Sequence, residues 1–171
     1  MGDTYGRIVY FIAAVIFMTL VPAMLVLQYT DKVATSHVDN AVKKFVDTCR
    51  ETGCVSEDAY YTLLDSLSST GYGYHTDIVC ESKTAYPADS GTYLPAYIPE
   101  GNQEVMDGMT THINVDSDGA FLLRQGDYIS VTVQSIEETT SSIMSRFLTL
   151  GIMNGKHITS TDGGRVGATY Q

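Results

Sequence analysis

The sequence predicts an α+β protein, with a long N-terminal helix followed by a small domain that has an antiparallel sheet and short helices. Residues 8–27, IVYFIAAVIFMTLVPAMLVL, carry no charge and are long enough to cross a bilayer as a helix. About 140 residues follow them, enough for one compact domain with its own core. In this remainder, segments with helical periodicity alternate with segments of strand periodicity. We therefore expect a membrane-spanning stalk helix over 1–52 and an extracytoplasmic domain over 53–171.

The apolar run predicts a retained membrane anchor rather than a cleaved secretion signal. A cleavable signal has about 7–15 apolar residues behind a basic leader. Here the run is longer, and the leader MGDTYGR carries one acid and one base. A helix of this length spans about 30 Å, the thickness of the hydrocarbon core. The side chains expected to make membrane or assembly contacts are Phe11, Phe17, Pro22 and Leu25.

Helical periodicity continues beyond the apolar run. No Gly or Pro lies between Ala23 and Glu51, and Gly53 is suited to cap the end of a helix. We expect one helix from about Tyr5 to Arg50, roughly 70 Å long at 1.5 Å per residue. Its second half is amphipathic, with an apolar face formed by Ala34, Val38, Ala41, Val42, Phe45, Val46 and Cys49.

A second helix and a first strand are predicted next. Ser56 is a suitable N-cap, followed by the acidic Glu57 and Asp58, and Gly71 ends the helix. The apolar stripe of this helix consists of Tyr60, Leu63, Leu64 and Leu67. Residues 72–81 then alternate as in a strand, with one face formed by Tyr74, Thr76, Ile78 and Cys80.

The remaining elements are shorter. Residues 82–101 hold three of the four prolines and predict a long surface loop. NQEVMDGMTTHI predicts a short helix, and GDYISVTVQSI is the clearest strand. SSIMSRFLTLGI predicts a last helix with Ile143, Met144, Phe147 and Leu148 buried. KHITSTDGGRVGATY predicts two short strands around a turn at Asp162-Gly163-Gly164.

Charge and motifs exclude several functions. The formal net charge is −10, and the basic residues are scattered, with only Lys43 and Lys44 adjacent. Because a nucleic-acid surface needs clustered Lys and Arg, no nucleic acid is expected as a partner. Walker A loops, serine nucleophile elbows and HExxH motifs are absent, and we expect neither catalysis nor an organic cofactor.

NVDSDG matches the first half of a calcium-binding loop. Asn114, Asp116 and Asp118 stand at alternate positions with Gly119 next, as such loops require. The twelfth position, which should be a bidentate Glu, is Gln125. An ordinary turn in an acidic protein is the alternative to a calcium site.

Three cysteines bear on the compartment. The preferred disulfide is Cys54–Cys80, with Cys49–Cys80 as the alternative, and either leaves one thiol over. A disulfide favours an extracellular domain. The lysines that follow the span weakly favour the opposite topology, although long domains translocate largely regardless of such charges. We place the C-terminal domain outside the cell on a single-pass anchor.

This organisation resembles the pilins of type IV filaments. The segments YFIAAVIFMTLVPAMLVLQYTDKVATSHVDNAVKKFVDTCRETG, YYTLLDSLSSTGYGYHTDIV and RQGDYISVTV are more specifically similar to small membrane-anchored, TadE-like proteins of tight-adherence pilus clusters in Gram-positive bacteria. The resemblance implies a minor pilin or pseudopilin, which an ATPase-driven platform would move from the membrane into a bundle of apolar stalks. Type IV pilins also carry a proline at about the depth of Pro22.

The chain departs from those pilins at its start. They carry a leader ending in Gly and a Glu five residues into the mature chain, whereas Tyr5 stands at that count from Met1. This favours a minor or uncleaved component. The alternative function is a membrane-anchored extracellular binding or adhesion domain, with the tyrosine-rich region 72–97 as its contact surface.

Overall fold

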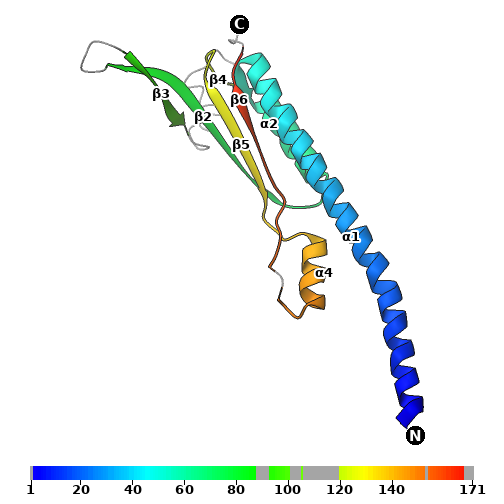
Figure 1. Ribbon diagram of the computed structural model, residues 1–171. Coiled ribbons are helices and arrows are strands. Elements are labelled where there is room, and N and C mark those ends of the chain that lie inside the picture. The colour runs from blue at the N-terminus through cyan, green and yellow to red at the C-terminus, as the bar shows by residue number, and fades with distance from the viewer. Residues whose placement is uncertain (1, 88–92, 101–104, 106–119, 153, 168–171) are drawn as a thin grey trace. The chain divides into compact units, whose positions relative to one another are not determined.

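The structure is a computed structural model that describes residues 2–87, 93–100, 105, 120–152 and 154–167. It confirms the α+β class. The elements run in the order α1 (Gly2–Thr52), β1 (Cys54–Ser56), α2 (Glu57–Ser68), β2 (Tyr74–Pro87), β3 (Tyr93–Glu100), β4 (Ala120–Leu122), β5 (Tyr128–Ser135), α4 (Thr140–Leu148) and β6 (Thr159–Arg165) (Figure 1). The described strands pair antiparallel in a two-stranded sheet, β1-β4, and a four-stranded sheet, β3-β2-β5-β6.

The chain forms two compact units, neither of which is continuous in sequence. The stalk unit consists of Met1–Ala34 and Glu138–His157, and the sheet unit of Thr35–Glu137 and Ile158–Gln171. The helix α1 therefore contributes to both units, and α4 belongs to the stalk unit. The domain boundary expected after residue 52 stays a prediction.

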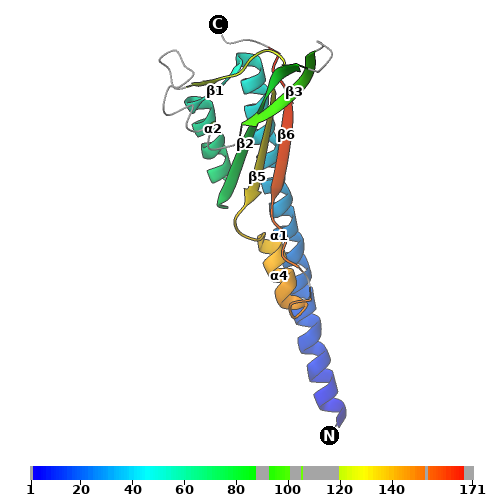
Figure 2. The same cartoon turned by 90° about the vertical axis from the view of Figure 1, so that its left-hand side faces the viewer.

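The core of the sheet unit lies between helices and sheet. The last turns of α1 and the helix α2 cover one face of the four-stranded sheet (Figures 1 and 2). Alternate residues of β5 are fully buried against these helices, as the sequence predicts for a strand with one covered face. The apolar core includes Val38, Val42, Phe45, Val46, Leu63, Leu67, Ile78, Ile129, Val131 and Val133.

The predicted helix caps are present. Gly53 has φ +71°, and its N–H donates to the Cys49 carbonyl at 3.0 Å, which ends α1. At the start of α2, the Ser56 hydroxyl accepts a hydrogen bond from the Ala59 N–H at 3.2 Å. These local signals fix where one helix stops and the next begins.

The prediction of a long loop over residues 82–101 is wrong. The strand β2 continues to Pro87, and β3 pairs with it from Cys80↔Glu100 to Pro87↔Tyr93. Proline cannot donate to a ladder, which is why this segment resembles a loop in sequence. Since β3 is an edge strand, its prolines are tolerated there.

The prediction of a hairpin around Asp162-Gly163-Gly164 is also wrong. The segment Thr159–Arg165 is one strand, β6, paired along its length with β5. Neither Gly163 nor Gly164 has a positive φ. A Cβ on Gly163 would lie 2.8 Å from the Ile129 carbonyl oxygen, and one on Gly164 would lie 2.7 Å from the Arg50 Nε. These glycines permit close approach of neighbouring groups rather than a turn.

The last predicted helix forms, as α4, but its predicted burial is wrong. Ile143, Phe147 and Leu148 are 51%, 78% and 38% exposed, and Met144 is half-buried. The short helix predicted over residues 102–113 lies outside the described residues, apart from the buried Val105.

Candidate functional site

The surface of α1 in the stalk unit is apolar and exposed. Among the described residues, α1 is the one helix long and apolar enough to cross a membrane, with a mean hydropathy of 2.5 in its most apolar 18-residue window. None of the residues in that window is fully buried by the rest of the chain. The predicted contact residues Phe11, Phe17 and Leu25 are 72%, 68% and 62% exposed. A continuous apolar surface of this size requires lipid or other helices to cover it.

Pro22 lies inside α1, and the helix continues through it. Proline has no N–H to donate to the Met18 carbonyl, so one backbone bond of the ladder is lost at this level. In the preceding turns, the Thr19 hydroxyl donates to the Val15 and Ile16 carbonyls at 3.1 and 3.0 Å. The residues after the span remain helical as far as Thr52.

The helix α4 has its polar face inward and its apolar face outward. Ser142 is buried, and its hydroxyl accepts a hydrogen bond from the Lys156 N–H at 2.8 Å. Ser145 and Thr149 are half-buried, and each donates to a backbone carbonyl four residues earlier. The exposed large apolar side chains on and after the helix are Ile143, Phe147, Leu148, Leu150 and Ile152, which we call the α4 patch.

The start of α4 is held by a residue of α1. Its N-cap, Thr139, makes no side-chain cap hydrogen bond. Instead, the Asp31 Oδ2 accepts a hydrogen bond from the Ser141 N–H at 3.0 Å, and Asp31 is buried. A carboxylate at a helix N-terminus both satisfies a free N–H and interacts favourably with the helix dipole. Asp31 of α1 thus caps the N-terminus of α4.

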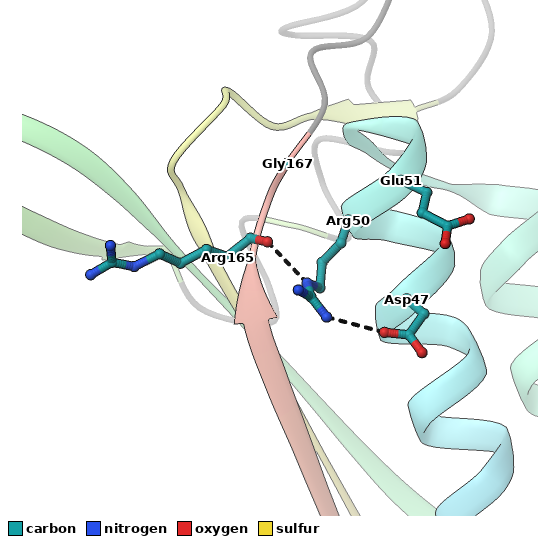
Figure 3. A pocket seen from close by; sticks show the side chains of 5 residues that line it. All are labelled: Asp47, Arg50, Glu51, Arg165 and Gly167. Carbon is teal, nitrogen blue, oxygen red and sulfur yellow. Dashed lines mark hydrogen bonds and ion pairs between the residues drawn. The ribbon is translucent and has the colours of Figure 1, made fainter.

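A hollow of about 390 Å³ lies in the sheet unit at the end of α1. It is lined by Asp47, Arg50, Glu51, Arg165 and Gly167 (Figure 3). The Arg50 Nε donates to the Arg165 carbonyl at 2.9 Å, and the Arg50 guanidinium pairs with Asp47 at 3.1 Å. The side chain of Arg165 points away from this pair (Figure 3). Arg50 therefore serves as a clamp between α1 and β6.

The disulfide predicted between Cys54 and Cys80 is not formed, and neither is the alternative between Cys49 and Cys80. All three residues are thiols, and all three are buried. Burial raises the pKa of the Cys49 thiol far above its usual value of 9.0, and the neighbouring Cys80 and Cys54 raise it further. The three side chains therefore meet in one part of the core. The spacing of the cysteines in the sequence can suggest which two would pair, but it cannot show that all three side chains lie together in the core.

No set of side chains in the described parts of the chain is arranged to hold a metal ion. The predicted calcium ligands Asn114, Asp116 and Asp118 lie outside the described residues, so the calcium site stays a prediction.

Asp31 and Arg50 were not identified from the sequence as functional positions. The partner of Asp31 lies 110 residues away and that of Arg50 lies 115 residues away. The one local signal for Asp31 is its place, four residues after the end of the apolar run, with no basic residue three or four positions away on the helix to pair with it.

Comparison with known proteins identifies no relative. No protein-family model matches the chain, and neither a curated protein nor a solved structure is significantly similar to it. The structure has a long apolar N-terminal helix followed by a small antiparallel-sheet domain, and this arrangement is consistent with a pilin-like architecture.

Proposed function

We propose that this protein is a structural subunit, a minor pilin or pseudopilin, of a type IV or tight-adherence-like surface filament. The observation that carries the proposal is the exposed apolar half of α1, which continues without a break into a half that is packed in the sheet unit. Before assembly, lipid would cover the apolar half. In a filament, the stalks of neighbouring subunits would cover the same side chains.

A continuous helix supports a stalk better than a tether. A tethered domain needs only a flexible linker after its span. Here α1 stays helical from the span to Thr52, and Val38 and Val42 on its later turns are fully buried. Displacement of the stalk would therefore act directly on the folded domain.

We further propose a single-pass membrane protein with its C-terminal domain outside the cell and other pilin-like subunits as partners. The placement outside the cell rests on the anchor and on the family resemblance, since no disulfide is formed. We propose no catalytic role. In the hollow at the end of α1, the guanidinium of Arg50 is already engaged by Asp47 and by the Arg165 carbonyl. This also weighs against an adhesion site there.

Shearing experiments test the subunit role. Phe17→Asp places a charge on the exposed face of the span, which costs about 2.5–3.5 kcal/mol at the centre of a membrane helix. We expect the variant chain to be lost from sheared surface filaments. Tyr61→Asp makes the same change at a 58% exposed position on α2, outside the stalk, and should leave incorporation intact.

Membrane fractionation separates failed insertion from failed assembly. Phe17→Ala keeps the span apolar, so this variant should remain in the membrane while it enters filaments less efficiently. Filaments that form normally without any wild-type chain in them would overturn the subunit role. That outcome, with the wild-type chain still in the membrane, would favour the anchored binding domain.

A further inference from the structure

The α4 patch is an apolar surface inside the unit that holds the membrane span. Phe147, Leu150 and Ile152 are 78%, 93% and 85% exposed. An ordinary amphipathic helix of a water-soluble domain turns such residues toward its core. In α4 the inward positions are instead taken by small hydroxyl residues, whose hydrogen bonds are made within the unit. This inverted orientation is suited to an apolar surrounding.

The contact with Asp31 fixes the level of α4 along the stalk. Asp31 lies four residues beyond Leu27, the last residue of the apolar run, which is about 6 Å along a helix axis. From this level α4 runs beside α1 toward the N-terminal end of α1 (Figures 1 and 2). Its nine residues extend about 13 Å, which carries its last turn past Leu27 to about the level of Pro22.

The face of α1 beneath α4 agrees with this placement. Leu20, Met24 and Leu27 are half-buried, whereas most of the span is exposed, and with Asp31 they recur at the spacing of one helical face. The α4 patch thus lies beside the apolar span and is continuous with the surface that the membrane must cover.

The single positive charge of α4 is compatible with this position. The Arg146 guanidinium reaches back to Glu138, at 2.8 Å, on the N-terminal side of the helix. It is therefore directed toward the level of Asp31 and away from the end of α4 that carries Leu150. Long basic side chains at membrane boundaries behave in this way, with the stem in the apolar layer and the charge outside it.

We propose that the α4 patch inserts into the lipid leaflet that surrounds Leu27, so that the protein contacts the membrane through a second, interfacial element beside its span. The occupant of the patch is the acyl-chain and headgroup boundary of phospholipid. This inference rests on the membrane anchoring in the proposed function, but not on filament assembly.

Single tryptophans test the proposal directly, because the chain contains none. Phe147→Trp and Leu150→Trp report on the patch, Phe17→Trp on the span, and Tyr61→Trp on an exposed site of α2. The full-length variants would be reconstituted at low protein density in phosphatidylcholine vesicles whose acyl chains carry bromine near the headgroup for the patch reporters, and near the end of the acyl chain for Phe17→Trp at the centre of the span. We expect both patch reporters to emit at shorter wavelength than Tyr61→Trp and to lose their emission severalfold to the brominated lipid. Iodide in the buffer should quench Tyr61→Trp most strongly.

The controls separate the ways in which the proposal can fail. If Phe17→Trp is not quenched by brominated lipid, the anchor itself fails, and with it the proposed function. If Phe17→Trp is quenched while both patch reporters behave like Tyr61→Trp, the lipid contact of α4 is overturned alone. Patch reporters that escape both quenchers, and become accessible to iodide as the protein is diluted in lipid, would show that a second copy covers the patch and would also overturn the proposal.

Discussion

Two amphipathic helical segments of this protein differ in whether their apolar face is buried. The later turns of α1 bury their apolar stripe, with Val38 and Val42 inaccessible and Phe45 only 4% exposed. The helix α4 has a similar stripe in sequence, yet Phe147 on it is 78% exposed. The difference teaches that periodicity reveals an apolar face without revealing what covers it. For α1 the cover is the protein's own sheet, and for α4 we propose that it is lipid.

The same substitution on each helix tests this contrast most strongly. Phe45→Ala removes a buried ring and should lower the free energy of unfolding of the sheet unit by about 3–5 kcal/mol. Phe147→Ala removes an exposed ring and should change the stability of the stalk unit, to which α4 belongs, by less than about 0.5 kcal/mol. Amide hydrogen exchange of the full chain in mild detergent measures both, at the β5 amides for Phe45→Ala and at the α4 amides for Phe147→Ala. Equal losses for the two variants would show that α4 is packed like α1.

The buried face of α1 should also confer a pH dependence. Because the pKa of Cys49 is raised in the folded protein, the unfolded chain loses this proton near pH 9 while the folded chain keeps it. The contribution of the Cys49 thiol to stability should therefore be constant below about pH 9 and fall above it, by about 1.4 kcal/mol per pH unit. Burial also raises the pKa of Tyr60 and of Tyr74, which would steepen the fall above pH 10.

Cys49→Ala isolates the thiol in that experiment. The variant starts from a lower stability, since a buried side chain is shortened, but its stability should fall less steeply between pH 9 and 10 than that of the wild type. Parallel pH profiles for the two proteins would contradict the assignment of this dependence to Cys49.

The smallest effect concerns the start of α4. Asp31→Ala removes the carboxylate that accepts from the Ser141 N–H and should cost about 1 kcal/mol of local stability, with Asp31→Asn partly restoring it. Amide exchange at Ser141 would then accelerate severalfold. The control is Thr139→Ala, because the Thr139 side chain makes no cap bond and its buried hydroxyl has no hydrogen-bond partner among the described residues. A greater effect of Thr139→Ala than of Asp31→Ala would contradict the cap assignment.

The sequence predicted the parts of the fold that local rules determine. The extent of α1, its end at Gly53, the Ser56 cap and the alternation in β5 all depend on residues within a few positions of one another. Each of these signals was correct. The exposed apolar span was equally accessible to prediction, because its length and composition require no knowledge of the tertiary structure.

The errors arose where a distant partner decides the outcome. The prolines of β3 are compatible with a strand only because β3 pairs with β2 at the edge of the sheet. Gly163 and Gly164 predict a turn in the sequence, but in the structure they allow β5 and the Arg50 side chain to pack closely against β6. The exposure of Phe147 and the capping role of Asp31 depend in the same way on which face of α4 meets α1. No window of sequence contains that information.

The position of α4 in the chain has a consequence for biogenesis. The helix lies between β5 and β6, two strands that are neighbours in the sheet, while its cap, Asp31, is 110 residues earlier. The stalk unit therefore stays incomplete until most of the polypeptide has been synthesised. Loop closure over such a distance is slow relative to local helix formation. In the membrane protein that we propose, α1 would thus insert first, and only the last stages of folding would bring α4 to the stalk and β6 to the sheet.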